Sequence, residues 1–379
     1  MNVVVAMDSF KGCMNSLEAG LAVKKGIERA RRSEGDSYSA NVIVSPLADG
    51  GEGTVEALVS GMKGDIKTSY VRGPLGKRVE ATWGVIEYGG VKTAIIEMAS
   101  AAGISLLDKS ELNPLYTTTY GVGELIKEAI ADGCRKFIIG IGGSATNDGG
   151  VGMLSALGYD FIDASGNKIT DGAIGLKNLK SISAKNRIPQ LDECSFLIAC
   201  DVKNPLCGDN GCSAVFGPQK GATPEMVKEM DAWLGKFAKI SGGNPDYPGA
   251  GAAGGLGFAF LTYTNATLES GIDIVIKETG LEEKIRNADV VVTGEGRLDA
   301  QSVMGKAPIG IAKLAKKYGK KVIAFCGSIS DDARICNEYG IDGYFSIINN
   351  IVTDSEAMDK ENALRNLDAT AEQVFRLIG

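Results

Sequence analysis

Short apolar runs that end in glycine-rich polar loops recur along this chain of 379 residues, and segments of helical periodicity follow these loops. The first run, residues 2–7, leads through Asp8–Gly12 into a predicted helix over residues 16–32, for which Ser16 is the expected N-cap. The pattern returns at residues 42–60 and 289–318, and a further strand is predicted at 321–326. Strands that alternate with helices predict an α/β fold with a largely parallel sheet covered on both faces.

The middle of the chain follows another pattern. Residues 66–98 alternate in short extended runs broken by glycines, which predicts hairpins. We therefore expect two α/β domains: a discontinuous one at 1–72 plus 286–379, with a mostly parallel flavodoxin-like or Rossmann-like sheet, and an inserted mixed α/β domain at 73–285. Because ligands of open α/β sheets bind at the carboxyl ends of strands, the active site is expected at the strand ends that lead into carboxylate-bearing loops.

Composition excludes several classes of protein. The net charge is −7 and no basic stripe is present, so nucleic acid is not an expected partner. The most apolar stretch, residues 249–261, is too short to span a bilayer, and the N-terminus lacks the pattern of a signal peptide. No membrane association is therefore expected, the expected location is the cytoplasm, and a homo-oligomer is left open.

The chain contains eight cysteines but no histidine. No pair of cysteines has Cys-x-x-Cys spacing, so reduced thiols are expected instead of a zinc site. The lack of histidine removes the side chain that most often transfers protons near neutral pH. Any general base is then a carboxylate, a lysine, a cysteine or a tyrosine.

The loop at residues 142–150 is the most informative motif. It follows a predicted strand, precedes a helix, and combines four glycines with Ser144, Thr146, Asn147 and Asp148. Glycines let backbone amides approach a phosphate, and the start of a helix adds partial positive charge. A tight turn that needs glycine is the alternative, but it does not require so many polar groups. We predict a phosphate or substrate loop.

A second glycine cluster, residues 249–254, has the glycine spacing of a dinucleotide fingerprint. No predicted strand precedes it, so the structural context of that fingerprint is missing. Close helix packing and a nucleotide-lining role for Gly251 and Gly254 both remain open. A P-loop motif is absent from the sequence.

Six carboxylates occupy glycine-rich loops that follow apolar runs: Asp8, Asp49, Asp148, Asp201, Glu295 and Asp299. One such acid is ordinarily a cap or turn residue, whereas six in equivalent contexts indicate a function. Oxygen-rich loops suit Mg²⁺, which takes one or two carboxylates together with phosphate oxygens. Lys11 and Arg297 are the cations nearest to these acids in the sequence.

These segments together resemble the bacterial glycerate kinases of glycolate and glucarate catabolism, over essentially the full length of the chain. The resemblance is carried by seven ordered blocks: residues 8–12, 48–53, 142–150, 200–206, 216–222, 249–257 and 293–301. Three small departures are Cys13 where serine is expected, Met7 where proline is expected and Ser302 where threonine is expected. The resemblance implies two α/β domains with the active site in the cleft between them. It also implies ATP as phosphoryl donor, Mg²⁺ as cofactor and D-glycerate as acceptor, with the 2-hydroxyl favoured over the 3-hydroxyl.

The resemblance does not assign catalytic roles, so we assign them from chemistry. Asp201 is the predicted general base, and Lys11 and Arg297 are predicted to stabilise charge on the phosphoryl group or the glycerate carboxylate. The predicted metal ligands are Glu295, Asp299 and Asp8. The predicted cofactor-binding residues are Gly142, Gly143, Ser144, Asn147, Asp148, Gly251 and Gly254.

Two other functions are compatible with parts of the sequence. A nucleotide-dependent dehydrogenase on a doubly wound sheet rests on the glycine patterns alone. A non-catalytic two-domain ligand-binding protein would need the cleft but not the acidic loops.

Overall fold

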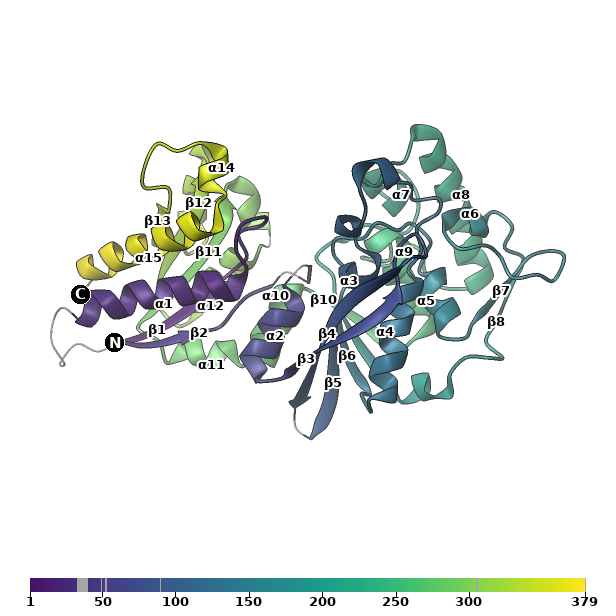
Figure 1. Cartoon of the computed structure of the whole chain (residues 1–379), viewed down its shortest axis with the longest axis horizontal. Helices are drawn as coiled ribbons and strands as arrows, with labels where there is room; N and C mark the ends of the chain where they lie inside the picture. Colours follow the sequence, from purple (N-terminus) through teal and green to yellow (C-terminus); the bar gives the residue numbers. More distant parts are fainter. Residues whose placement is uncertain (33–39, 49, 52, 89, 305, 379) are drawn as a thin grey trace. The chain divides into compact units, whose positions relative to one another are not determined.

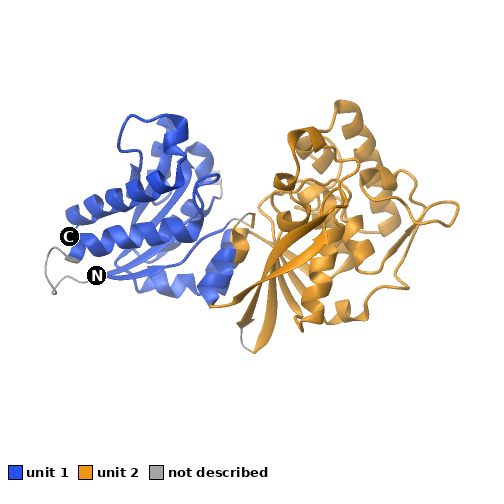
Figure 2. Ribbon diagram, in the orientation of Figure 1, with its two compact units in different colours: residues 1–49, 56–62, 272–379 blue, residues 50–55, 63–271 orange. Residues whose placement is uncertain are grey.

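The computed structural model describes residues 1–32, 40–48, 50–51, 53–88, 90–304 and 306–378. The chain divides into two compact units: unit 1 comprises residues 1–49, 56–62 and 272–379, and unit 2 comprises 50–55 and 63–271 (Figure 2). Each unit is α/β, as expected from the sequence, and we describe each by itself. Asp49 of the 48–53 motif lies outside the described residues.

Unit 1 is built on a five-stranded sheet of order β13-β12-β11-β1-β2, in which every pairing is parallel (Figure 1). Its strands are β1 (Asn2–Met7), β2 (Asn41–Val44), β11 (Val290–Leu298), β12 (Lys321–Ile329) and β13 (Gly343–Ser346). The helices of this part of the chain are α1 (Ser16–Arg32), α2 (Thr54–Met62), α10 (Gly271–Glu278), α11 (Leu281–Arg286), α12 (Ala307–Lys317), α13 (Ile335–Glu338), α14 (Asp354–Ala357) and α15 (Lys360–Leu377). The predicted parallel sheet is thus confirmed.

The interior strand β1 is buried on both faces, which explains its nearly continuous run of valine. Val3, Val5 and Met7 pack into the core beneath α1 and α15, whereas Val4 and Ala6 are buried on the opposite side of the strand. Burial of both sides of one strand requires helices on both faces of the sheet.

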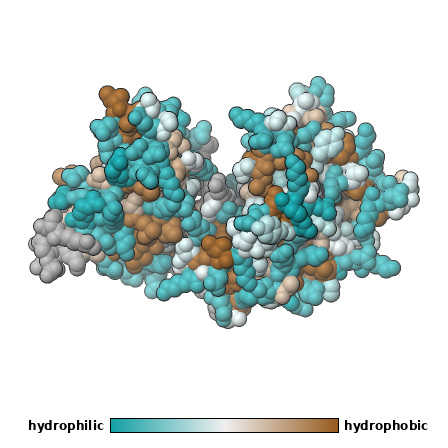
Figure 3. Space-filling model, in the orientation of Figure 1, coloured by the Kyte–Doolittle hydropathy of each residue, from teal (hydrophilic) through white to brown (hydrophobic). Residues whose placement is uncertain are grey.

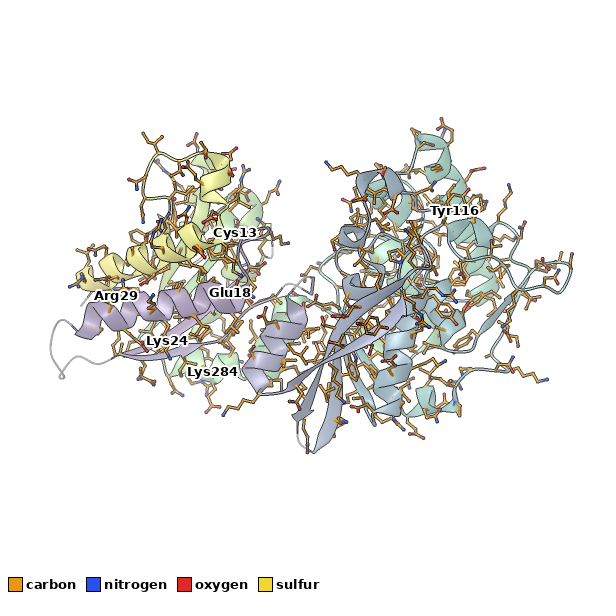
Figure 4. The ribbon with its side chains drawn as sticks, in the orientation of Figure 1. Cys13, Glu18, Lys24, Arg29, Tyr116 and Lys284 are labelled. Carbon is orange, nitrogen blue, oxygen red and sulfur yellow. The ribbon has the colours of Figure 1, made fainter. Side chains whose placement is uncertain are left out.

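The helices α1 and α15 are held together by close backbone contact and by ion pairs. A Cβ added at Gly26 of α1 would overlap the carbonyl oxygen of Asp368 on α15. Beside this contact Arg29, labelled in Figure 4, donates to Asp368 at 2.7 Å and to Glu372 at 2.9 Å. The glycine therefore permits the approach that brings these charges together.

The start of α1 differs from the prediction. Asn15, not Ser16, caps the helix: its side chain accepts from the Glu18 amide at 2.8 Å, while the Glu18 carboxylate accepts from the Asn15 amide at 3.1 Å. This reciprocal pair is a capping box. The sequence pattern Asn-x-x-Glu at residues 15–18 is a capping signal, and it begins one residue before Ser16, the predicted N-cap.

Unit 2 is built on a six-stranded mixed sheet of order β10-β9-β6-β5-β4-β3. The pairs β10·β9, β9·β6 and β6·β5 are parallel, and β5·β4 and β4·β3 are antiparallel, which confirms the predicted hairpins. Its strands are β3 (Asp65–Arg72), β4 (Arg78–Tyr88), β5 (Val91–Glu97), β6 (Lys136–Gly140), β9 (Ser195–Ala199) and β10 (Ala266–Glu269), with a separate pair β7 (Asp160–Ile162) and β8 (Ser181–Ser183). The helices of unit 2 are α3 (Ala99–Ala102), α4 (Tyr120–Ala131), α5 (Val151–Ala156), α6 (Ala173–Leu176), α7 (Cys212–Phe216), α8 (Pro224–Ser241) and α9 (Ala252–Tyr263).

Aromatic side chains tie the centre of this sheet together. Phe137 of β6 and Phe196 of β9 occupy paired positions on neighbouring strands, and their rings stack with centroids 4.7 Å apart. Phe260 of α9 packs on Phe196 at 5.8 Å. The strands whose loops carry the predicted site residues are therefore fixed by a common apolar core.

The two units divide the chain differently from the predicted domains in three segments. Residues 50–55 belong to unit 2. Residues 63–72 belong to unit 2, because β3 pairs with β4 along its whole length. Residues 272–285 belong to unit 1 and contain most of α10 and most of α11. The location of the active site relative to the two units stays a prediction.

Apolar side chains are exposed on one segment of unit 1. Ile348, Ile351 and Val352 precede α14, where Figure 3 shows a hydrophobic tip. The segment follows β13, so it lies at the carboxyl edge of the parallel sheet. Within the described residues, no helix combines the length and the apolar character that crossing a membrane would require.

Replacement of Gly26 by alanine tests the contact between α1 and α15. Alanine favours an isolated helix, but here its methyl group meets the backbone of α15, so we expect Gly26→Ala to destabilise unit 1 by about 1–3 kcal/mol. The matched control is Gly235→Ala in α8, where the added methyl group meets only the Cys207 sulfur at 3.9 Å and should stabilise by about 0.5–1 kcal/mol. Scanning calorimetry measures both changes, and stabilisation by both substitutions would contradict the close contact.

Candidate active site

In unit 1, two buried acids lie at the carboxyl ends of neighbouring strands. Asp8 follows β1 and Glu295 lies near the end of β11; the residues before them, Met7 and Gly294, are paired in the sheet. The Asp8 amide donates to the Gly294 carbonyl oxygen at 2.9 Å. The parallel register therefore places two predicted metal ligands side by side at this edge.

Glu295 is held by a hydroxyl group and an ammonium group. Its carboxylate accepts from Ser302 Oγ at 2.7 Å and from Lys306 Nζ at 3.2 Å. Burial is the largest influence and raises the pKa of Glu295, against the opposing effect of Ser302 and Lys306. A buried carboxylate with a shifted pKa and a neighbouring cation is typical of a functional site.

The charged cluster extends from Glu295 to the remaining predicted residues of unit 1. Asp299 lies 3.6 Å from Lys306 Nζ and 3.3 Å from Arg297 Nε. Arg297 itself is exposed. The loop after β1 reaches the same place, since a Cβ at Gly296 would lie 3.5 Å from Phe10 Cα and 3.7 Å from the backbone nitrogen of Lys11. Unit 1 thus brings together Asp8, Glu295, Arg297 and Asp299, and the backbone of Lys11 lies beside them.

The sequence analysis missed Ser302 and Lys306 as members of this cluster. Lys306 is the N-cap residue of α12, where a positive charge opposes the helix dipole. That unfavourable placement was the available signal for a function. Ser302, found where threonine was expected, retains the hydroxyl group that donates to Glu295.

In unit 2, the predicted loop at 142–150 follows β6, and most of it is buried. Asp148 is fully buried and accepts from the Thr119 amide and hydroxyl, at 2.8 and 2.9 Å, and from the amides of Gly150 and Gly152, at 3.0 and 3.2 Å. Burial raises the pKa of Asp148, and these four donated hydrogen bonds favour its charged form. Asp148 therefore holds the loop in place from within unit 2.

Ser144 and Asn147 also have partners inside unit 2. Ser144 Oγ accepts from the buried Lys220 at 2.7 Å, and Asn147 Nδ2 donates to Ser213 Oγ at 2.8 Å. Gly143 is exposed and adopts φ +71°, whereas Ser144 is 8% exposed and Asn147 is fully buried. The accessible part of the loop is therefore Gly142 to Ser144, and Lys220 is a second charged residue that the sequence analysis did not select.

Gly251 and Gly254 allow neighbouring loops to approach. The Gly251 amide donates to the Asn204 carbonyl at 3.0 Å, and the Gly254 carbonyl accepts from the Gly149 amide at 2.9 Å. A Cβ at either glycine would overlap backbone oxygen atoms, those of Pro205 and Thr146. These contacts agree with the first of the two interpretations of the glycines, close packing at the helix. The other interpretation, that Gly251 and Gly254 line a bound nucleotide, stays a prediction.

Asp201 follows β9, the strand next to β6. It is exposed, and its Oδ1 accepts from the Gly271 amide at 3.1 Å. Glu97, at the end of β5 on the other side of β6, accepts from the Val55 amide at 2.8 Å. Acids therefore flank the Gly142–Ser144 loop on both neighbouring strands.

A cavity of about 430 Å³ in unit 1 lies elsewhere. It is lined by residues at the amino ends of β1 and β2 together with α11, including Asn2, Asn41 and Lys284, the last labelled in Figure 4. Partial burial lowers the pKa of Lys284. Because the predicted residues occupy the opposite, carboxyl edge of the same sheet, this cavity does not belong to their cluster.

The fold and the charged residues at the carboxyl ends of its strands define an α/β protein built to hold polar ligands. The profile of the glycerate kinase family matches residues 3–379. The chain is 45% identical to glycerate 2-kinase of Escherichia coli K12, over 98% of both chains, and 45% identical to glycerate kinase of Bacillus subtilis 168, over 99% of this chain and 97% of that one. A solved structure of a candidate glycerate kinase 2 from Salmonella typhimurium LT2 matches with a TM-score of 0.87 and 44% identity, over 100% of this chain and 98% of the other. The chain belongs to the glycerate kinase family.

Because Glu295 is buried, we expect that removing its charge will lower activity without lowering the stability of the fold. Because its folded-state pKa is raised, the stability that Glu295 contributes is fully present below its unfolded pKa of about 4.3 and is lost as pH rises through the folded pKa. We expect Glu295→Gln to keep or raise the Tm at pH 7, while turnover in a glycerate kinase assay falls by about 100-fold or more. The control is Glu283→Gln, an exposed acid on α11. A large drop in Tm with unchanged turnover would show that Glu295 is only structural.

Proposed function

We propose that this protein transfers the γ-phosphoryl group of ATP to the 2-hydroxyl of D-glycerate. The observation that carries the proposal is the cluster of Asp8, Glu295 and Lys306 at the carboxyl edge of the parallel sheet, in a chain that belongs to the glycerate kinase family. The name of the relative from Escherichia coli, glycerate 2-kinase, supports the 2-hydroxyl. Family membership also favours the kinase over the dehydrogenase and the non-catalytic binding protein.

Unit 1 is the proposed site of the phosphates. The described residues contain no group of three or more acid or cysteine side chains arranged to hold a metal ion. Mg²⁺ in kinases needs only one or two carboxylates, since phosphate oxygens and water complete its shell. Asp8 and Glu295 fit that requirement, with Asp299 beside them, and bound Mg²⁺ would neutralise phosphate charge.

The cations of the same cluster have a complementary role. Lys11, Arg297 and Lys306 are proposed to contact phosphate oxygens and to stabilise the charge that develops during transfer. The exposed apolar segment with Ile348, Ile351 and Val352 follows β13 at the same edge and offers a surface for the adenine base. Consumption of ATP also supports the cytoplasmic location expected from the sequence.

Unit 2 is the proposed site of the acceptor. Asp201 is the proposed general base: it is exposed at the end of β9, and the chain has no histidine to compete for that role. Its hydrogen bond from the Gly271 amide orients the carboxylate. The neighbouring Gly142–Ser144 loop is proposed to position the substrate.

A coupled assay tests both the activity and the position of phosphorylation. The protein is incubated with MgATP and D-glycerate, and ADP release is followed. Enolase then dehydrates the product directly if it is 2-phosphoglycerate, whereas 3-phosphoglycerate reacts only after a mutase is added. Absence of glycerate-dependent ADP release would overturn the proposed activity, and a requirement for mutase would overturn the proposed position.

Asp201→Asn tests the assignment of the base. Asparagine keeps the oxygen atom that accepts from Gly271 but removes the charge and the basicity, so we expect kcat to fall by about 10²-fold or more while ATP still binds. Steady-state kinetics and a direct ATP titration measure the two properties. Asp209→Asn, an exposed acid in the loop that follows, is the matched control. A kcat within a few-fold of wild type would remove Asp201 from this role, and loss of ATP binding would reassign it to the nucleotide.

A further inference from the structure

Lys220 is a buried lysine beneath the accessible part of the 142–150 loop. It ends a short 3₁₀ turn at Pro218–Lys220 and is 1% exposed. Its ammonium group donates to Ser144 Oγ at 2.7 Å and to the Thr146 carbonyl oxygen at 2.6 Å. Neither partner is charged, and among the described residues no carboxylate lies within ion-pair distance of Lys220; the buried Asp148 carboxylate acts on it electrostatically without a direct contact. A buried positive charge without a paired anion is costly, so its position calls for a function.

The contact with Lys220 determines what Ser144 can do. An ammonium group has only donors, so the Ser144 oxygen must accept, and its own hydroxyl proton remains available to donate elsewhere. Ser144 is 8% exposed and follows the exposed Gly143, so a ligand can reach this end of the loop.

Two backbone amides add to the donors at this place. The amides of Gly143 and Ser144 form no hydrogen bond with any other residue that the structure describes. Gly143 is in the left-handed region at φ +71°, a conformation in which successive amides can form a concave anion site. The loop therefore presents up to three donors, with the Lys220 charge directly behind them.

We propose that Gly143 and Ser144, backed by Lys220, form the site for the carboxylate group of D-glycerate. This inference rests on the proposed function. Lys220 acts as a positioning residue, because it reaches the substrate through Ser144 and through its charge.

Charge balance favours the carboxylate over the phosphates of ATP. One ammonium group matches the single negative charge of a carboxylate, whereas a triphosphate brings several. Asp201 follows the adjacent strand, β9, in which Ala199 pairs with Gly140 of β6. The negative charge of Asp201 disfavours binding of a polyphosphate at this place. The same acid is the proposed base, and because it follows the strand next to β6, the proposal places the glycerate hydroxyl on the Asp201 side of the carboxylate site.

The proposal predicts a dependence of substrate affinity on pH. Burial lowers the pKa of Lys220 to about 8, against the smaller opposing effects of the buried Cys212 thiol and the buried Asp148 carboxylate. A bound carboxylate favours the protonated lysine, so glycerate affinity is full below pH 8 and weakens as pH rises above that value.

Lys220→Met is the direct test, because methionine keeps most of the length of the side chain without its charge. We expect the KM for D-glycerate to rise about 10- to 100-fold, while the KM for MgATP stays within about 2-fold. Lys220→Arg should recover part of the loss. The matched control is Lys236→Met on α8, which also removes an ammonium bonded to a backbone carbonyl, that of Lys177 at 3.0 Å, and should leave both KM values unchanged.

Measurements on the wild-type protein keep the proposal testable if Lys220→Met does not fold. Calorimetric titration with D-glycerate between pH 7 and 9.5 should show affinity falling above pH 8, and flat affinity would overturn the proposal. A rise in the KM for MgATP alone, or no change in either KM, would overturn it as well. Titration requires no turnover, so failure of the kinase assay with intact, pH-dependent glycerate binding would reject the proposed function but retain the carboxylate site.

Discussion

The buried carboxylate of Asp148 is the interaction on which the geometry of unit 2 depends. Four hydrogen bonds converge on it, from Thr119 at the start of α4 and from the amides of Gly150 and Gly152 at the start of α5. A buried charge without such donors would be prohibitively costly, so the carboxylate and its donors can exist only together. These hydrogen bonds fix the loop after β6 between α4 and α5. The accessible residues Gly143 and Ser144 are part of the same loop and are therefore held in position as well.

Backbone-to-backbone contact completes this arrangement. Gly254 lets α9 begin against Thr146 and Asn147, and the adjacent Ala253 is left-handed at φ +51°, a strained conformation for a residue with a side chain. Larger residues at these positions would push the loop outward. The glycines of this family motif are therefore explained by the packing of loops around a site, without requiring that each glycine touch a ligand.

The two units handle buried charge in different ways. In unit 1, Glu295 is balanced by Lys306 and Ser302, and the neighbouring Asp299 and Arg297 extend the cluster toward solvent. In unit 2, Lys220 has only neutral acceptors. A cluster of mixed charges suits a metal ion with phosphates, whereas an ammonium group without a direct ion pair, behind neutral donors, suits a single anion. This contrast underlies the division of substrates that we propose between the units.

The sequence by itself determined the α/β class, the parallel sheet around β1 and the loops that carry Asp8, Asp201 and Glu295, because alternating apolar patterns and glycine-rich loops are local signals. Local signals also predicted the hairpins of β3 to β5. Only the tertiary structure decided that Asn147 and Asp148 face inward, that β3 belongs to the second sheet, and that Lys220, distant in the sequence, lies under Ser144. The physical reason is that burial and hydrogen-bond partners are set by which segments pack together, and a polar residue in a loop looks the same in sequence whether it binds a ligand or holds the loop.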